Sequence, residues 1–449
     1  MDYQSFKQAV IERAKALGIA EYELYYSSSS DTSVEVFQHE VKGFSSGLSG
    51  GVCFRCIVNG RMGYASTQAL TAEEAAAIVD RAAANAEVLE ADEPVFLCEG
   101  GMEYEKLERE AAPLPATDAL IAKTLELQDK LYAADPAVID GTESQGLSIH
   151  SETAIYNSKG LDLYRADDLV GVVAAAVVSD GQEMADAFEI KLSPLDKLDL
   201  DAVASKTVAK AKRKLGGGVP DTAQCPVVFS PDAMSDLLSV FSAIFSSENT
   251  QKGLSRLDGK EGEVIAAPCV TLVDDPFYPE NPCAASFDDE GYPTHKKNVI
   301  ENGRLNTLLY NLKTAAVAGK TSTGNGSKAG YTASVNVSPF TMYLAPGQLT
   351  EEELVAQAGN GVYIDSVTGL HAGASAVSGD FSLQSAGFLI KDGKKTGEYV
   401  KSFTVAGNFY DLLKNITALS NKVVLPTALG STAFASPAVL VEGLSIAGK

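Results

Sequence analysis

Apolar residues recur at intervals of three and four along several segments, a spacing that places them on one face of a helix. In the first such segment the face includes Phe6, Val10 and Leu17, and Gly18 is expected to end the helix. The same spacing predicts helices over 71–89, 118–133, 201–215 and 231–245, and weaker ones over 313–318 and 350–358.

Short runs of alternating or continuous apolar residues predict strands between these helices. They cover 22–27, 33–38, 51–58, 61–65, 138–143, 147–153, 154–158, 169–179 and 225–229. Asn59-Gly60, Asn302-Gly303 and Asp392-Gly393 each follow an apolar run, and such pairs form tight hairpin turns because they tolerate positive φ. The part after residue 253 therefore reads mostly as strands and turns.

Two helix starts are marked by their capping residues. Ser230-Pro231-Asp232 combines an N-cap serine, a proline at the first helical position and an acid in the first turn. An apolar stripe that ends at Ile244 and Phe245 predicts that this helix is buried on one side. Thr350 and Glu353 have the spacing of a capping box.

Breaks in this pattern divide the chain into three expected domains. Three consecutive glycines, Gly216-Gly217-Gly218, are followed by Pro220, and a linker-like passage over 96–117 contains Pro113 and Pro115. We predict an N-terminal α+β domain (1–105), a central α/β domain (106–220) and a C-terminal β-rich domain (221–449). The fold class is α+β: two small helix-and-sheet units followed by a mostly antiparallel β domain with a few helices.

Charge and composition limit the function classes. The chain has 449 residues and a formal net charge of −23, which argues against direct binding of nucleic acid. Its one compact basic run, 206–214, is interpreted as the solvated face of a helix. No run approaches the roughly 18 apolar residues of a membrane span, and the first residues read as an amphipathic helix rather than a signal peptide. We therefore expect a cytoplasmic protein that does not bind membranes.

The cysteines and histidines give no metal or catalytic motif. Six cysteines are scattered along the chain, and Cys53 and Cys56 are expected on opposite faces of a strand. The four histidines form no H-x-x-x-H or H-x-H pair. Gly47-Leu48-Ser49-Gly50-Gly51 is expected between strands, which is the wrong context for a nucleophile elbow, and no Walker-type phosphate loop is present.

Several longer motifs together resemble the TldD/PmbA family, known as modulators of DNA gyrase and as the two-subunit TldD/TldE metalloprotease. They comprise Val273-Asp274-Asp275, Asp288-Asp289-Glu290-Gly291-Tyr292-Pro293-Thr294, Val299-Ile300-Glu301-Asn302-Gly303, Thr323-Gly324-Asn325-Gly326, Ser378-Gly379-Asp380-Phe381-Ser382 and Gly387-Phe388-Leu389-Ile390. The resemblance covers the whole chain.

The resemblance also implies which subunit this is. The family's catalytic subunit has His-Glu-x-x-x-His on the helix after an apolar strand, where two histidines bind zinc and the glutamate is the general base. The three positions fall here on Ser239, Val240 and Ile244, and no cysteine follows Cys283 to supply a third ligand. The chain thus resembles the PmbA/TldE type, and we expect no catalytic residue, no metal and no cofactor in it.

The resemblance leads to one preferred function and two alternatives. We expect a non-catalytic subunit of a zinc metallopeptidase complex that acts on extended or unfolded peptides, paired with a zinc-bearing TldD-like subunit or forming a homodimer. His371, Gly373, Asp380 and Asp289 are candidates to line its cavity, although a turn or loop role is the commoner one for such residues. The alternatives are an independent hydrolase near His371, and a regulator of DNA gyrase through protein–protein contact.

Overall fold

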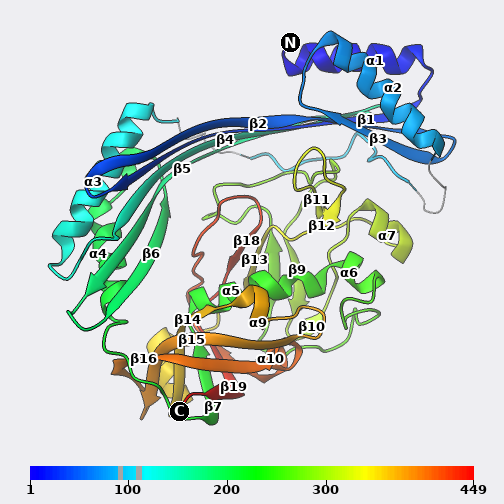
Figure 1. Cartoon of the computed structure of the whole chain (residues 1–449). Coiled ribbons are helices and arrows are strands. Elements are labelled where there is room, and N and C mark those ends of the chain that lie inside the picture. The colour runs from blue at the N-terminus through cyan, green and yellow to red at the C-terminus, as the bar shows by residue number, and fades with distance from the viewer. Residues whose placement is uncertain (89–94, 108–113) are drawn as a thin grey trace.

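The computed structural model describes residues 1–88, 95–107 and 114–449. A long, curved sheet arches over a C-terminal body, and both ends of the sheet approach that body (Figure 1). The sheets are mostly antiparallel and are combined with helices, so the predicted α+β class is confirmed. Pro113 of the predicted linker lies outside the described residues.

The arching sheet is antiparallel throughout, with the strand order β3-β2-β1-β4-β5-β6. Its strands are β1 (Glu21–Phe37), β2 (Glu40–Val58), β3 (Arg61–Thr67), β4 (Glu143–Asn157), β5 (Asp162–Ser179) and β6 (Met184–Leu192). Pairing of β1 with β4 joins strands from 1–105 and 106–220 into one sheet.

The strands are much longer than the sequence pattern predicted. The separate short strands at 22–27 and 33–38 are wrong, because β1 continues through both, and 47–51 lies inside β2 rather than between strands. Serines in β1 and serines and glycines in β2 interrupt the apolar alternation. They stay extended because β1 has hydrogen-bonded neighbours on both sides, namely β2 and β4.

Two helix pairs cover the convex face of this sheet, one pair at each end (Figure 1). They are α1 (Tyr3–Ala16) with α2 (Ala72–Val88), and α3 (Thr117–Ala134) with α4 (Leu200–Lys212). Leu24 of β1 packs under the first pair, whereas the next residue, Tyr25, faces the C-terminal body. The same alternation separates Cys53 from Cys56, so their predicted placement on opposite faces is confirmed.

The C-terminal body is built on two sheets. One has the order β16-β15-β14-β7-β19-β17 and closes into a ring because β16 also pairs with β19; the other has the order β10-β9-β8-β13-β18. The first contains β7 (Ala223–Phe229), β14 (Gly361–Thr368), β15 (Asp380–Lys391), β16 (Lys394–Asn408), β17 (Ile416–Leu419) and β19 (Val439–Ala447). The second contains β8 (Leu272–Asp275), β9 (Lys297–Glu301), β10 (Arg304–Leu305), β13 (Thr341–Leu344) and β18 (Ala433–Ala435), and a separate pair consists of β11 (Gly326–Ser327) and β12 (Asn336–Val337).

Helix α5 (Pro231–Phe241) follows β7 and packs in the core shared by these two sheets. Short helices complete the body: α6 (Ser247–Gln251), α7 (Leu312–Ala318), α8 (Glu351–Ala358), α9 (Leu370–Gly373) and α10 (Phe409–Asn415). The predicted caps are confirmed, since Ser230 accepts a hydrogen bond from the Ala233 amide and Thr350 forms a capping box with Glu353. All three predicted hairpin turns have positive φ at both residues.

Candidate functional site

The positions that correspond to the family's zinc motif lie at the C-terminal end of α5. Ser239 is exposed, Val240 is half-buried against the core, and Ile244 is completely buried in the 3-10 turn that follows. Between them, the Phe241 ring stacks on Phe409 with 4.4 Å between ring centroids. Aliphatic and aromatic contacts therefore occupy this region.

One carboxylate on the same helix was missed by the sequence analysis. Asp236 lies one turn before Ser239, whose hydroxyl donates to the Asp236 carbonyl at 2.7 Å. Burial, and secondly the charge of Asp232, raises the pKa of Asp236 to about 6. A carboxyl group on an amphipathic helix gives no sequence signal for such a shift, because the shift depends on what packs over it.

His371, Gly373 and Asp380 lie in one region, on α9 and at the start of β15. α9 packs against both α5 and β15. His371 and Asp380 are exposed, and Asn408 donates a hydrogen bond to Asp380 at 2.8 Å, which lowers the pKa of that carboxyl. A Cβ at Gly373 would lie 2.4 Å from the Ser382 carbonyl oxygen, so this glycine permits close backbone packing.

Asp289 lies elsewhere, on the surface of the C-terminal body that faces the arching sheet. Its Oδ1 accepts hydrogen bonds from Arg165 of β5 at 3.0 Å and from the Tyr25 hydroxyl of β1 at 3.2 Å. Its Oδ2 accepts from the Lys328 amide at 2.8 Å. Asp289 also lines a small cavity of about 10 Å³ together with Arg165 and Asp288. The four candidates therefore fall in two different places.

A buried acidic cluster adjoins Asp289 and was not predicted. Asp288 and Glu290 are almost completely buried, and Glu290 lies beside Glu23 and Arg55 of the concave side of the sheet. Arg55 donates to Glu23 at 2.7 Å. Within the described part of the chain, Glu23 Oε2 and Arg55 Nη2 are buried without a hydrogen-bond partner. Burying these charged groups lowers the stability of the folded state unless opposite charges compensate one another.

Burial controls the protonation of this acidic cluster. It raises the pKa of Glu290 to about 7, although the Arg55 charge and the Leu312 amide oppose the rise. It also raises the pKa of Asp288, helped by the charge of Glu290 and opposed by three backbone N–H donors. Lys328 is packed over the Tyr25 ring at 4.1 Å, and burial lowers its pKa.

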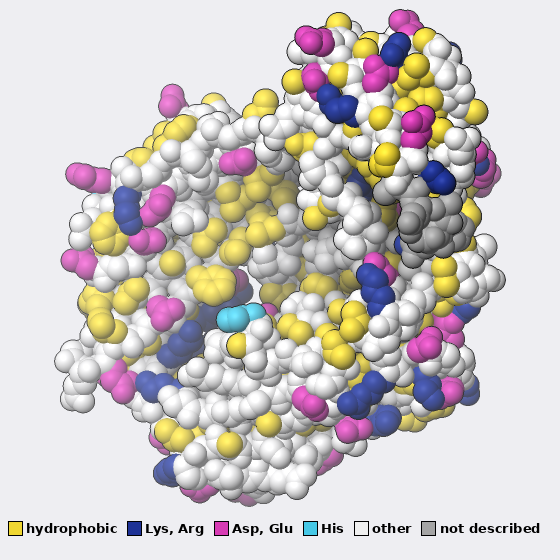
Figure 2. Space-filling view, turned by 45° about the vertical axis from the view of Figure 1, so that its right-hand side comes forward, with side chains coloured by type: hydrophobic (Ala, Val, Ile, Leu, Met, Phe, Trp, Pro, Cys, Tyr) yellow, Lys and Arg dark blue, Asp and Glu magenta, His cyan; other side chains and the backbone are white. Residues whose placement is uncertain are grey.

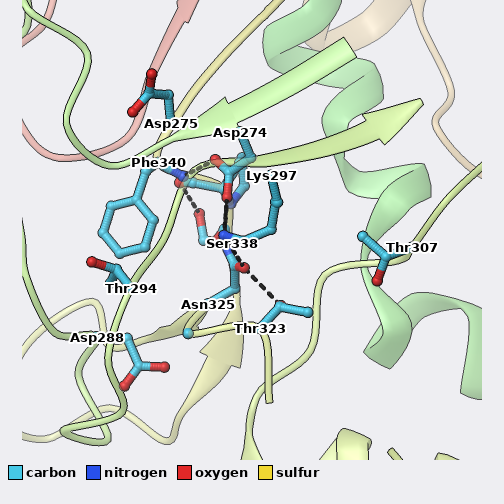
Figure 3. A network of polar contacts seen from close by, with 12 residues as sticks. Asp274, Asp275, Asp288, Thr294, Lys297, Thr307, Thr323, Asn325, Ser338 and Phe340 are labelled. Carbon is cyan, nitrogen blue, oxygen red and sulfur yellow. Dashed lines mark hydrogen bonds and ion pairs between the residues drawn. The ribbon is translucent and has the colours of Figure 1, made fainter. Parts of the chain in front are cut away.

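A second buried network holds the segment that carries these acids (Figure 3). The Asp274 carboxylate accepts hydrogen bonds from Lys297 at 3.0 Å and Asn325 at 2.8 Å through Oδ2, and from the Phe340 amide at 2.7 Å through Oδ1. Three of the family-like motifs meet here, because the amide of Gly326 also donates to Asp288. With its donors and acceptors paired, the network is suited to fixing the loops rather than to catalysis.

The basic run 206–214 lies on an exposed face of α4 and just after it, as predicted, and its charges form ion pairs there. Lys206 and Lys210 both contact Glu189 of β6, and Arg213 contacts Asp365 of β14 at 3.3 Å. The positive charges join α4 to its sheet and to the C-terminal body. The sheet is thus held at one end by this run and at the other by the Asp289 contacts.

Between these two attachments the molecule is hollow (Figure 2). A cavity of about 800 Å³ lies between β5 and β6 on one side and two loops of the C-terminal body on the other. Its size is that of a ligand-binding pocket. Within residues 1–88, 95–107 and 114–449, no three His, Cys, Asp or Glu side chains converge as a metal site. No helix in these same ranges is long and apolar enough to cross a membrane.

Comparison with known proteins identifies the family. Three family models match: the PmbA/TldA metallopeptidase domain 1 over 22–86, the central domain over 111–215 and the C-terminal domain over 222–448. The chain belongs to the PmbA/TldD metallopeptidase family, as its motifs predicted.

Its similarity to individual members extends over nearly the whole chain. It is 29% identical, with a TM-score of 0.88, to a Thermotoga maritima structure described as a candidate modulator of a DNA gyrase, covering 99% of this chain and 100% of that one. It is 25% identical, with a TM-score of 0.86, to TldE from Thermococcus kodakarensis, covering 98% and 100%. It is 26% identical to the metalloprotease PmbA homologue of Haemophilus influenzae, covering 94% and 92%.

Proposed function

We propose that this chain is the non-catalytic subunit of a TldD/TldE-like zinc metallopeptidase complex that acts on extended or unfolded peptides. The partner would be a TldD-like subunit that carries the zinc ion, the general base and the metal ligands. We propose a cytoplasmic location, with a heterodimer as the working assembly and a homodimer when the partner is absent.

The observation that carries this proposal is the chemistry of the α5 end. Catalytic zinc needs about three nitrogen, sulfur or oxygen donors from the protein. Ser239 offers a single hydroxyl, and Val240 and Ile244 offer no donor. Ile244 is in addition completely buried, and the neighbouring aromatic pair Phe241–Phe409 fills the space beside it.

Membership of the metallopeptidase family and likeness to TldE support a role in peptide cleavage by a complex. The central cavity supports a role in holding the substrate, because it is large enough for a short extended segment. This chain would then contribute walls of the substrate chamber, while the partner contributes the chemistry.

The test is reconstitution with a zinc-bearing TldD-like homologue. We expect the isolated chain, supplied with zinc, to bind less than a stoichiometric amount by elemental analysis and to leave an unfolded protein uncleaved. We expect the mixture to form a 1:1 complex by light scattering and to cleave the same protein.

A matched control separates the roles of the two subunits. Changing the first motif histidine of the partner to alanine should abolish cleavage and leave the complex mass unchanged. Stoichiometric, chelator-resistant zinc in the isolated chain, or cleavage by it alone, would contradict the proposal.

A further inference from the structure

Strand β6 forms a free edge of the arching sheet, beside the central cavity. It pairs with β5, and the described residues contain no other strand paired to it. Just beyond β6, the Ser193 amide donates to the Val170 carbonyl at 2.9 Å, so Ser193 directs its backbone at β5. Because antiparallel pairing alternates, Glu189 and Lys191 also face β5, whereas Ile190 and Leu192 turn their N–H and C=O groups outward.

A contact farther along the strand agrees with this assignment. Asp186 and Ile190 are an even number of residues apart on β6, so their backbone groups point the same way. The carbonyl of Asp186 accepts a hydrogen bond from the Lys214 side chain at 2.7 Å rather than from β5. The outward groups beyond that point are available for pairing. An unpaired edge of this kind is a template for another extended segment.

The residues of β6 whose backbone faces outward also form an apolar surface on the concave side, and two of them, Ile190 and Leu192, line the cavity. The Glu189 side chain lies on the convex side, where it contacts Lys206 and Lys210 of α4. By alternation, Phe188, Ile190 and Leu192 point to the concave side. Phe188 is 67% exposed, which is unusual for so large an apolar side chain.

The cavity is open to solvent and is walled on two sides by the chain itself. Its lining comprises 166–170 of β5, 190–194 of β6 and the segment after it, and the loops 279–282 and 425–428 on the opposite side. Both walls belong to one chain, and the space between them is about 800 Å³. This space suits a single extended segment and is too small for a folded domain.

Two charged side chains of the cavity lining, Glu280 and Lys191, are exposed. Lys191 points to the convex side with Glu189 by alternation, so Glu280 is the charge that bears on the occupant. Glu280 lies in the loop opposite β6. The other acids there are engaged: Asp168 contacts His150 at 2.6 Å, and Asp167 lies beside Arg165. No ion pair of Glu280 occurs among the residues that the structure describes, so its charge is available to a cationic side chain.

We propose that the free edge of β6 binds an extended, apolar polypeptide segment as an added strand, with a lysine or arginine of the segment near Glu280. The proposal rests on the proposed peptide-handling function and gives that function a substrate class and a location. Backbone pairing would hold many sequences, while the apolar wall at Phe188, Ile190 and Leu192 would select alternating apolar side chains.

The first test uses the isolated full-length chain and needs no catalytic activity. The probe is a fluorescent ten-residue peptide that alternates valine with threonine or lysine, and its binding is measured by fluorescence anisotropy. Two further peptides carry N-methyl groups on either the odd or the even amides. Alternating side chains disfavour a one-residue register shift, so we expect one series to lose at least tenfold in affinity and the other to retain binding.

The second test changes the protein. Ile190→Pro removes an amide that faces outward and leaves the β5 pairing intact, which is tolerated on an edge strand. Ile190→Ala is its control, since it shortens the side chain but keeps the amide. We expect the proline variant to bind at least fivefold more weakly than the alanine variant, and Glu280→Gln to reduce affinity for the lysine peptide but not for an all-threonine version.

Three results would overturn the inference: equal loss in both N-methyl series, no binding by the wild-type chain, or a dimer of this chain that Ile190→Pro dissociates. If Ile190→Pro does not fold by circular dichroism, the N-methyl series decides alone. Binding retained without cleavage by the reconstituted pair would count against the proposed function only. Cleavage retained without binding at β6 would count against this inference only.

Discussion

Arg165 and Asp289 are 124 residues apart in sequence and form an ion pair at 3.0 Å that joins the arching sheet to the C-terminal body. Arg165 also donates to the Phe287 carbonyl at 3.0 Å, so one guanidinium group holds two points of the same loop. The loop in turn carries the buried acids Asp288 and Glu290. This contact therefore couples the position of the sheet to two buried carboxyl groups with raised pKa values.

Replacing Arg165 with methionine should destabilise the protein by about 3 kcal/mol, because it leaves the mostly buried Asp289 without its cation. Urea denaturation followed by circular dichroism measures the effect. Lys252→Met removes an exposed ion pair with Glu248 and serves as the control, with an expected change below about 0.5 kcal/mol. Adding Asp289→Asn to Arg165→Met should restore part of the loss, and an additive double variant would contradict the pairing.

Glu290 should make stability fall as the pH rises. Its pKa in the folded protein is about 7, above the ordinary value of 4.5, so the folded state holds a proton that the unfolded state releases. The resulting stabilisation is fully present below pH 4.5 and is lost as the pH rises through 7, by up to about 3 kcal/mol. Glu290→Gln should remove this part of the pH dependence and be the more stable protein at pH 8.

The measurement is the unfolding free energy of wild type and variant between pH 4 and pH 8. Parallel curves would show that folding does not raise the pKa of Glu290 and that the prediction is wrong. Glu352→Gln, on the exposed face of α8, is the matched control and should leave the curve unchanged.

Gly373→Ala should destabilise the fold by about 1–3 kcal/mol, because the added Cβ would lie 2.4 Å from the Ser382 carbonyl oxygen and the backbone must move. The change tests whether α9 needs this close packing on β15. Gly397→Ala is a suitable control, since nothing lies within 4 Å of its added Cβ and its φ is not positive. Equal melting temperatures for the two variants would show that α9 can shift away without cost.

Restoring the family's zinc motif should not create a peptidase. Ser239→His alone should change stability by less than about 0.5 kcal/mol, because the residue is exposed. Ile244→His should cost about 3 kcal/mol, because it places an imidazole in a fully buried apolar position. The variant that combines Ser239→His, Val240→Glu and Ile244→His should therefore be less stable and inactive. A stable triple variant that binds zinc and cleaves peptides would show that the remaining site is intact.

Local features were determined by the sequence itself. The helix start at Ser230, the capping box at Thr350 and the turn at Asn59-Gly60 depend on residues within a few positions of one another, so the sequence alone predicts them. The family was also recognisable from motifs, because each motif is a short run of particular residues that can be seen in the sequence alone. The three-domain division stays a prediction.

Only the tertiary structure decided the long strands and the buried charges. The serine run of β1 has little strand character by itself, and it is extended because β2 and β4 pair with it on both sides. From the sequence, Asp289 was interpreted as a turn residue. The structure shows that Arg165 and Tyr25 pack against it and donate hydrogen bonds to its carboxylate. The raised pKa of Glu290 likewise depends on burial beneath β1 and β2, which lie more than 200 residues earlier in the chain. The pattern of residues close together in the sequence does not predict such contacts, because they depend on how distant segments pack against one another.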